Sequence, residues 1–479
     1  MNFKMIGKIT GSAMIIEAAC LILMMFVSLI YREDVSPFLY TIAILVVLGG
    51  LLSFATRKSN AFSSRGGFAS TVLIWLAFTA FGALPFWFCG QFESYTDCFF
   101  EAMSGFTTTG ASILTDIEAL PKGILMWRSF THFIGGMGIL VLTAAILPSS
   151  GSRAHYLMQA EVPGPTADKL VPSLAKSSKI LYSMYVALTV LECICLLIAG
   201  LPLYDSITVS FSTAGTGGFC VLNNSIAGYQ NEAVEVITSI FMLLFSINFS
   251  IYFLLLTGKF KQAFKSSELK VFLGMVAASV FLICLNVNHM FDTVWDTFRN
   301  TLFIVASTIS TTGFCLPDYA LWPSFAQTII IIIMLCGACA GSTGGGIKTS
   351  RVIILYRSIE REIKQIIHPH SVNIIRVDGK AVDKATVHSV LRFVGAYFVI
   401  SFIATLLISL DNFDFSTNFS AIISCMSNVG PGFNAVGPTQ NFSIFSDLSK
   451  WICSACMLIG RLEIFPILIF FTPSTWKRT

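Results

Sequence analysis

Charged residues are scarce in this sequence, and their scarcity argues against a soluble globular protein. Only 12% of the 479 residues are Asp, Glu, Lys or Arg, whereas soluble proteins carry about 25%. Hydrophobic residues make up 55% of the chain, and the mean hydropathy is +0.77. Because so apolar a chain is stable only where lipid covers much of its surface, we expect an all-α integral membrane protein.

The residue groupings that are typical of enzymes are also lacking. The histidines are scattered along the chain without a carboxylate cluster at metal-binding spacing: His132, His155, His289, His368, His370 and His388. Two C-x-x-C pairs begin at Cys336 and Cys453, but both lie in apolar runs without a neighbouring His or Asp. Cysteine in such places behaves as a small hydrophobic residue. We therefore predict a protein that is not an enzyme and has no organic cofactor.

Long apolar runs are abundant instead. A helix that crosses a bilayer needs about 20 consecutive, mostly apolar residues. Such runs lie at residues 6–30, 38–56, 68–90, 124–147, 178–201, 232–257, 271–289, 325–350, 387–409 and 449–472. With a cytoplasmic N-terminus, most Lys and Arg fall on the inner side, including the run 351–384. This asymmetry predicts the orientation of the protein.

One pattern occurs four times after the first two spans. Each copy has a span, a short and moderately apolar stretch, a turn rich in Thr and Gly, and a second span. The turns, at residues 106–112, 214–219, 310–314 and 427–433, align on Gly110, Gly217, Gly313 and Gly430. We therefore expect an N-terminal two-helix extension (1–66) and four pore repeats (67–150, 151–265, 266–362 and 363–479).

The short stretches before the turns predict four re-entrant helices. They lie at residues 96–106, 204–213, 296–309 and 415–426, and they open near Asp97, Asp205, Asp296 or Asp414. A helix too short to cross the bilayer can return only where protein or water satisfies its backbone. Glycine allows the backbone angles that turn carbonyls toward one axis, and threonine adds a hydroxyl oxygen. Rings of carbonyls replace the hydration shell of K⁺ in potassium-type filters, so we expect a pseudo-fourfold pore for a monovalent cation.

The residues expected to bind K⁺ in this filter belong to all four turns. They are Thr108, Thr109, Gly110, Thr216, Gly217, Thr311, Thr312, Gly313, Asn428, Val429 and Gly430. Because Val429 lacks the hydroxyl of threonine, the ring should be only pseudo-fourfold. The acidic residues on the outer side are either ordinary solvated loop residues or the source of a field that concentrates cations.

The eighth span contains a glycine-rich segment, formed by Gly341, Ser342, Thr343, Gly344, Gly345, Gly346, Ile347 and Lys348. It is not a nucleotide-binding loop, because that motif needs Lys directly after its last glycine. Glycines in a helix cost about 1 kcal/mol each relative to alanine, so we expect the helix to break here. The break is either a kink that allows close helix packing or a mobile loop that obstructs the pore.

Arg461 lies inside the last apolar run, near Glu463 and Pro466. An arginine in a membrane segment is costly and faces a cavity or a partner. It either forms a structural ion pair with another segment or projects below the filter as an electrostatic barrier to cations.

These motifs resemble the TrkH/TrkG potassium-uptake family of bacteria, which is related to KtrB and to the plant HKT transporters. The resemblance covers nearly the whole chain and is carried by residues 101–112, 135–140, 159–165, 212–219, 310–314, 341–349, 428–433 and 460–463. It implies four M1–pore helix–M2 repeats with an extra N-terminal helix pair, a gating loop at 341–348 and a gating arginine at Arg461. The filter glycines in all four copies are similar to those of the potassium-selective members.

The resemblance also implies partners and a location. It implies a homodimer in the bacterial inner membrane and a cytosolic TrkA-like regulatory subunit that binds nucleotides. The basic loop 351–384 and the segment 153–179 are either the docking surface for that subunit or lipid-facing basic residues. Sodium/potassium symport and less selective transport of monovalent cations are alternative functions, and a carrier with broken helices does not explain four filter-like turns.

Overall fold

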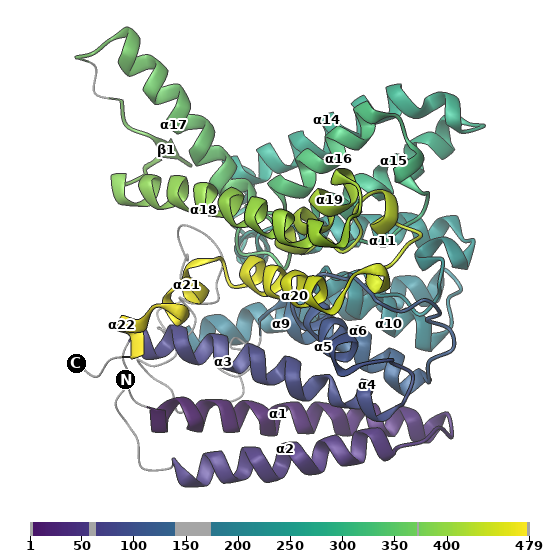
Figure 1. The fold of residues 1–479 in the computed structure, drawn as a ribbon. Helices are drawn as coiled ribbons and strands as arrows, with labels where there is room; N and C mark the ends of the chain where they lie inside the picture. The colour runs from purple at the N-terminus through teal and green to yellow at the C-terminus, as the bar shows by residue number, and fades with distance from the viewer. Residues whose placement is uncertain (1–2, 57–63, 139–173, 371–372, 477–479) are drawn as a thin grey trace.

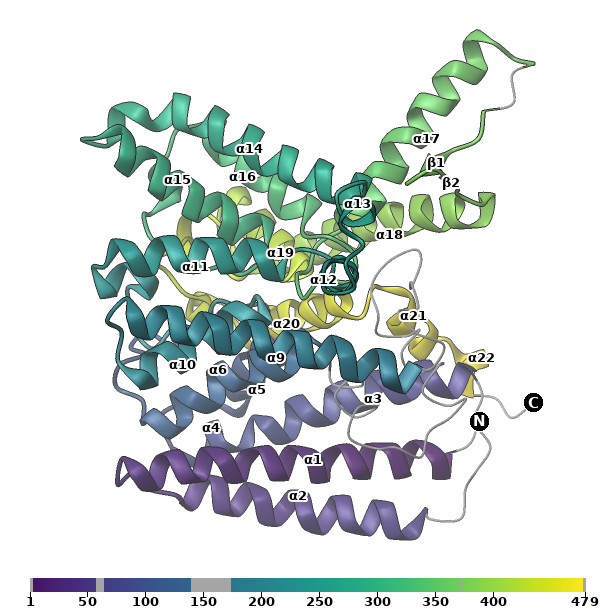
Figure 2. The same cartoon turned by 180° about the vertical axis from the view of Figure 1, so that it is seen from behind.

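The structure is a computed structural model of the chain and describes residues 3–56, 64–138, 174–370 and 373–476. The described part is a bundle of helices with one two-stranded antiparallel hairpin (Figure 1). The N-terminal helix pair is α1 (Phe3–Ile30) and α2 (Ser36–Ala55), which pack side by side at one edge of the bundle (Figures 1 and 2). On α2, Val47, Leu51 and Phe54 stay exposed. An apolar surface of this kind suits contact with lipid.

The four repeats follow in order. The first consists of α3 (Ser64–Gly82), α4 (Leu84–Phe88), α5 (Tyr95–Phe106) and α6 (Lys122–Gly136). The second consists of α9 (Leu174–Ile198), α10 (Leu203–Gly215), α11 (Glu232–Phe245), α12 (Phe249–Leu256) and α13 (Phe260–Ala263). The third consists of α14 (Ser267–Val287), α15 (Val294–Ile309), α16 (Ser324–Cys336) and α17 (Thr349–Ile367). The fourth consists of the hairpin β1 (Arg376–Val377) and β2 (Lys380–Ala381), then α18 (Lys384–Ile408), α19 (Phe415–Ser427), α20 (Asp447–Arg461), α21 (Phe465–Phe471) and α22 (Pro473–Trp476).

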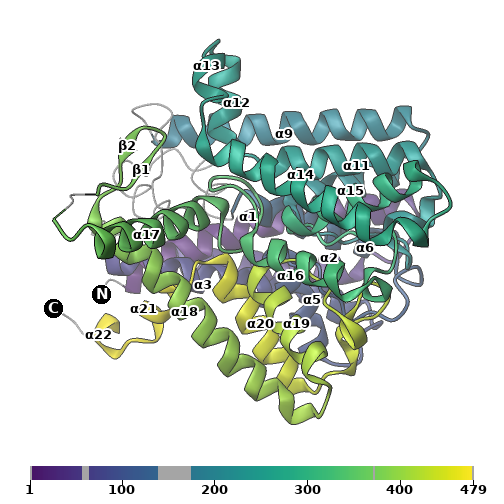
Figure 3. The same ribbon diagram turned by 90° about the horizontal axis from the view of Figure 1, so that it is seen from above.

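Six helical segments in the described residues are long and apolar enough to cross a membrane: Ile6–Ile30, Ser36–Ala55, Gly67–Phe88, Ser177–Ile198, Ser267–Met290 and Lys384–Asp411. Two further predicted spans are bent rather than straight. The α11–α12 pair bends by 91°, so that α12 and α13 stand away from the bundle (Figure 3), and the α20–α21 pair bends by 120°. At the second bend, Glu463 and Ile464 have positive φ and Pro466 lies in the first turn of α21, so the helix cannot continue past Arg461.

The two remaining predicted spans also differ from the expectation. The predicted span 124–147 contains most of α6, which ends at Gly136, and its residues 139–147 lie outside the described part of the chain. The predicted span 325–350 is broken, since α16 ends at Cys336 and α17 starts only at Thr349. The boundary expected between residues 362 and 363 falls within α17, which ends at Ile367. The boundary at 66 falls in the first turn of α3, which begins at Ser64.

Four short helices, α5, α10, α15 and α19, lie where the re-entrant helices are expected. Three of them have a side-chain N-cap, from Ser94, Thr293 and Asp414, which accepts from the amide three residues later. The fourth, α10, begins directly after Pro202. Local sequence therefore starts each helix near the predicted acidic residue.

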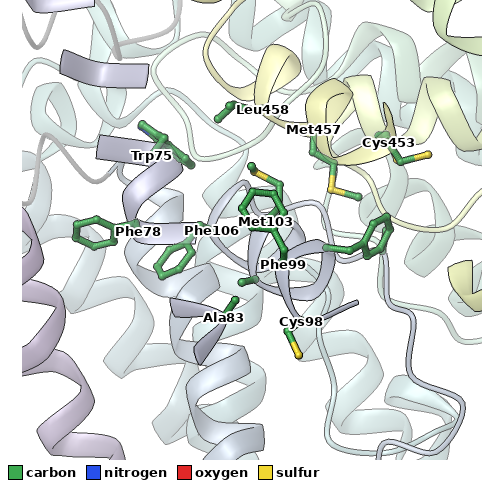
Figure 4. Packing of buried hydrophobic residues seen from close by; sticks show 14 of the residues in the cluster. Trp75, Phe78, Ala83, Cys98, Phe99, Met103, Phe106, Cys453, Met457 and Leu458 are labelled. Atoms are coloured by element: carbon green, nitrogen blue, oxygen red, sulfur yellow. The ribbon is translucent and has the colours of Figure 1, made fainter. Parts of the chain in front are cut away.

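The first and fourth repeats meet in a buried hydrophobic core. Figure 4 shows residues of this core from α3 (Phe78), α5 (Met103 and Phe106) and α20 (Met457), with Met103 between Phe106 and Met457. The rings of Phe99 of α5 and Trp451 of α20 pack with centroids 4.6 Å apart. This contact closes the circle of repeats, because it joins the last repeat to the first.

Candidate functional site

Each of the four turns repeats the same backbone conformation. A residue with φ of 53–60° follows the end of the short helix, and a glycine with φ of 79–103° comes two residues later. The pairs are Thr108 and Gly110, Thr216 and Gly218, Thr311 and Gly313, and Asn428 and Gly430. Glycine adopts these angles readily, and other residues rarely do. The four turns are therefore structurally equivalent.

The second turn corrects the predicted alignment by one residue. Gly218, rather than Gly217, has the positive φ and corresponds to Gly110, Gly313 and Gly430. Gly217 instead occupies the place of Thr109, Thr312 and Val429. Because two glycines are adjacent here, the sequence allows two alignments of this turn with the other three. Only the backbone conformation distinguishes them. Gly217 stays within the turn but has a different role.

The four equivalent glycines form a closed ring of contacts. A Cβ placed on Gly110 would lie 1.9 Å from the Gly217 carbonyl oxygen, and one on Gly218 would lie 2.1 Å from that of Thr312. One on Gly313 would lie 1.9 Å from the Val429 oxygen, and one on Gly430 would lie 2.6 Å from that of Thr109. Each turn thus touches the carbonyl of the next, from the first to the fourth and back to the first. No side chain fits at these glycines without moving backbone atoms.

A cavity of about 340 Å³ lies on one side of this ring. It is lined by the same four glycines and by residues that follow each turn, among them Ser112, Asn223 and Asp318. The lining residues come from all four repeats. The cavity therefore adjoins the ring of glycines and is shared by all four repeats.

A buried ion pair supports the first and second turns from behind. Arg128 of α6 contacts Glu101 of α5 at 2.5 Å, and both side chains are almost fully buried. Glu101 accepts from the hydroxyl of Ser112, while Arg128 donates to the Cys220 carbonyl at 3.0 Å. The pair therefore ties the segments after both turns to one point. Sequence analysis missed this ion pair. Arg128 lies inside the predicted span 124–147, and an arginine in a membrane segment indicates a buried partner, as for Arg461.

Asn428 joins the fourth turn to the first. Its side-chain amide donates to the Thr109 hydroxyl and to the Met457 carbonyl, both at 2.9 Å. The neighbouring Ser427 hydroxyl bonds the Tyr397 hydroxyl of α18 at 2.8 Å. The Asn428 amide and the Ser427 hydroxyl thus hold the fourth turn in position. Val429 of the same turn has no hydroxyl to contribute.

The glycine-rich segment forms a loop, residues 337–348, that packs against the third and fourth turns. The Gly345 amide donates to the Thr311 hydroxyl at 2.6 Å. A Cβ on Gly344 would lie 2.7 Å from the Ser310 carbonyl oxygen, and one on Gly345 would lie 2.2 Å from that of Ser427. Glycine is therefore needed here for close backbone approach. The segment is a separate loop rather than a kink, because no helix spans residues 337–348.

Three further contacts fix the ends of this loop. The Ala340 amide donates to the Glu268 carboxylate of α14 at 2.7 Å, and the Cys339 amide donates to the Ser246 carbonyl at 3.1 Å. The Lys348 ammonium donates to the Gly344 carbonyl within the loop. Glu268 is a second residue that sequence analysis missed, and its place at the start of a span gave no local signal.

Arg461, the last residue of α20, connects the loop to the first repeat. Its guanidinium donates to the Thr343 carbonyl at 2.8 Å and to the Gly135 and Gly136 carbonyls of α6 at 2.5 and 2.7 Å. The nearby Glu463 pairs instead with Arg351 of α17, at 2.5 Å. Arg461 thus binds backbone carbonyls of two other repeats, on the side of the turns that faces the loop.

Comparisons with known proteins agree with this architecture. Residues 35–478 match the TrkH family, which is described as a cation transport protein. The Trk system potassium uptake protein TrkH of Salmonella typhimurium strain LT2 is 36% identical over the full length of both chains. TrkG of Escherichia coli K12, also a Trk system potassium uptake protein, is 34% identical over 95% of this chain and 94% of its own.

A solved structure agrees as well. The crystal structure of the potassium transporter TrkH from Vibrio parahaemolyticus superimposes with a TM-score of 0.90, at 32% identity and with full coverage of both chains. These relatives are transporters, which are a class distinct from enzymes. The chain is a multi-pass membrane protein and belongs to the TrkH/TrkG family of cation transport proteins.

Proposed function

We propose that this protein takes up potassium ions across the cell membrane through a four-repeat selectivity filter. The single observation that carries the proposal is the cyclic contact of the four glycines, each with a carbonyl of the next turn. The carbonyl oxygens of such a ring can take the place of the water molecules that a cation loses when it enters the pore. The potassium uptake named for the relatives in Salmonella typhimurium and Escherichia coli supports K⁺ as the substrate.

The short helices add to the attraction for cations. Each of α5, α10, α15 and α19 ends immediately before its turn, at Phe106, Gly215, Ile309 and Ser427. The C-terminal end of a helix carries a partial negative charge from its unpaired carbonyls. Four such ends around one ring favour a cation there. The K⁺-binding residues in this proposal are those predicted from sequence, together with Gly218.

We also propose that the loop 337–348 and Arg461 form the gate. The loop packs against two of the four turns, and Arg461 holds it by the Thr343 carbonyl. A fixed positive charge on the inner side of the turns opposes the passage of a cation. Opening then requires the loop to leave the third and fourth turns, which breaks the contact between Arg461 and Thr343.

The proposal extends to location and partners. Both chain ends lie at the end of the bundle where α17 and the hairpin extend (Figures 1 and 2), and α17 carries several Lys and Arg. The positive-inside rule supports a cytoplasmic position for this end, in the bacterial inner membrane. We propose a homodimer whose cytoplasmic end binds a TrkA-like nucleotide-binding regulatory subunit. The predicted docking segment 153–179 lies largely outside the described residues.

Complementation of a bacterial strain deficient in potassium uptake tests the function, and flux of Rb⁺ and Na⁺ in proteoliposomes tests the selectivity. We expect growth at low K⁺ and faster flux of Rb⁺ than of Na⁺. Gly110→Ser or Gly313→Ser should reduce the preference for Rb⁺ while membrane insertion is kept. Na⁺ flux equal to or above Rb⁺ flux in the unmodified protein would favour the less selective alternative.

A further inference from the structure

The second turn contains a residue that no other turn matches. Gly217 occupies the place that Thr109, Thr312 and Val429 hold in the other three turns. Those three side chains are fully buried behind the ring. The Thr109 hydroxyl bonds that of Thr107 at 2.9 Å, and the Thr312 hydroxyl bonds that of Ser310 at 2.6 Å. Three corners of the ring are thus supported by a side chain of their own turn, and the second corner has none.

The imidazole of His132 fills the missing space. A Cβ on Gly217 would lie 1.5 Å from His132 Nδ1 and 2.2 Å from Cε1, so the ring occupies the volume where a side chain of residue 217 would be. The backbone of α6 is also close to the turn, since a Cβ on Gly215 would lie 2.3 Å from the His132 carbonyl oxygen. His132 therefore stands in direct contact with the turn, behind the carbonyl that faces Gly110.

The environment of the imidazole indicates that its bulk matters more than its polarity. His132 is fully buried, and its ring packs on that of Phe219 with centroids 4.1 Å apart. Neither ring nitrogen has a hydrogen-bond partner among the residues that the structure describes. Burial of a polar group without a hydrogen-bond partner costs free energy. The packing of the imidazole must offset that cost.

We propose that His132, through its volume, sets the position of the second filter corner and thereby contributes to ion selectivity. It acts from the first repeat as a substitute for the side chain that Gly217 lacks. This inference rests on the proposed function of the four turns as a filter. Close packing transmits a change of even one methylene, so an empty space behind one corner would let its carbonyl retreat from the ion.

Variants that remove the imidazole of His132 and add a side chain at Gly217 test the inference in proteoliposomes. The readout is the ratio of Rb⁺ to Na⁺ flux. His132→Ala should lower the ratio by about tenfold, the change that a difference of about 1.4 kcal/mol in ion binding produces. Gly217→Thr alone should disrupt the turn, because its side chain would overlap the imidazole. The double variant His132→Ala/Gly217→Thr should recover most of the native ratio. His132→Leu, which keeps the bulk but not the nitrogens, should stay close to native.

Ile134→Ala is the matched control, because Ile134 is equally buried on α6 and lies in the hydrophobic core instead. A native ratio in His132→Ala, while Gly110→Ser lowers it, would overturn the inference and leave the filter intact. Loss of selectivity in His132→Leu as severe as in His132→Ala would also overturn it. If Gly110→Ser itself has no effect, the filter proposal fails and this inference falls with it. Should His132→Ala not fold, His132→Asn compared with His132→Leu gives the same test.

Discussion

The guanidinium of Arg461 donates a hydrogen bond to the carbonyl oxygen of Thr343 at 2.8 Å, which joins the end of α20 to the glycine-rich loop of the third repeat. The same side chain reaches the Gly135 and Gly136 carbonyls of the first repeat. One arginine therefore couples three repeats on the side of the ring that the loop occupies. A change in this contact should alter how easily the loop moves.

Arg461→Ala should raise cation flux. Hydrogen bonds from a charged group contribute about 1.5–3 kcal/mol each, so their loss should favour the open state by about tenfold or more. Initial rates of Rb⁺ flux in proteoliposomes measure the effect. Arg392→Ala, at an exposed position of α18, serves as the control and should leave the rate unchanged. A normally folded Arg461→Ala with unchanged or lower flux would contradict the gate.

Gly218→Ser should damage selectivity as severely as Gly110→Ser, because both residues are in the left-handed region and both touch a carbonyl of the next turn. The ratio of Rb⁺ to Na⁺ flux is the readout. Gly274→Ser is the matched control, since a Cβ on this glycine of α14 meets no atom within 4 Å. Native selectivity in Gly218→Ser would mean that the corrected alignment of the second turn is wrong.

Arg128→Leu should destabilise the protein strongly, because it leaves the Glu101 carboxylate buried without its cation. Breaking a buried pair by removal of one partner costs about 3–5 kcal/mol. Thermal unfolding in detergent should show a clear fall in the midpoint. The exposed pair of Lys364 and Glu360 on α17 is the comparison, and Lys364→Ala should not change the midpoint measurably. Equal midpoints for both variants would contradict a supporting role for the buried pair.

Glu268→Ala should increase flux, since the Ala340 amide then loses its acceptor and one end of the loop is released. Glu268→Gln retains a side-chain oxygen that can accept the hydrogen bond, and we expect it to stay near native. The loss of one hydrogen bond of about 1.5–3 kcal/mol predicts an increase in flux of about tenfold or more. If Glu268→Gln and Glu268→Ala behave alike, the carboxylate charge and not the hydrogen bond is what acts on the loop.

Several features follow from sequence alone because they depend on local chemistry. Apolar runs long enough to cross a bilayer predict the membrane spans, and six of them are helical segments of that length and composition in the structure. The four short helices were also predictable, since an acidic residue near the start and a Thr/Gly-rich turn at the end bound each one. The break in the eighth span follows from its glycines in the same way. Each of these features is set by residues close together in the chain.

Other features depend on which distant segments touch, and only the tertiary structure decides them. The sequence does not show whether Gly217 or Gly218 is equivalent to the filter glycines of the other turns. The contact of Gly218 with the Thr312 carbonyl identifies Gly218 as the equivalent residue. The α6 helix brings Arg128 to Glu101 and His132 to Gly217, and the bend after Arg461 brings its side chain to Thr343. Because these partners lie far apart in sequence or on different helices, no local pattern specifies their contact. The sequence thus determined a membrane protein with four pore repeats, while packing between the repeats decided which atoms form the ring and what holds it.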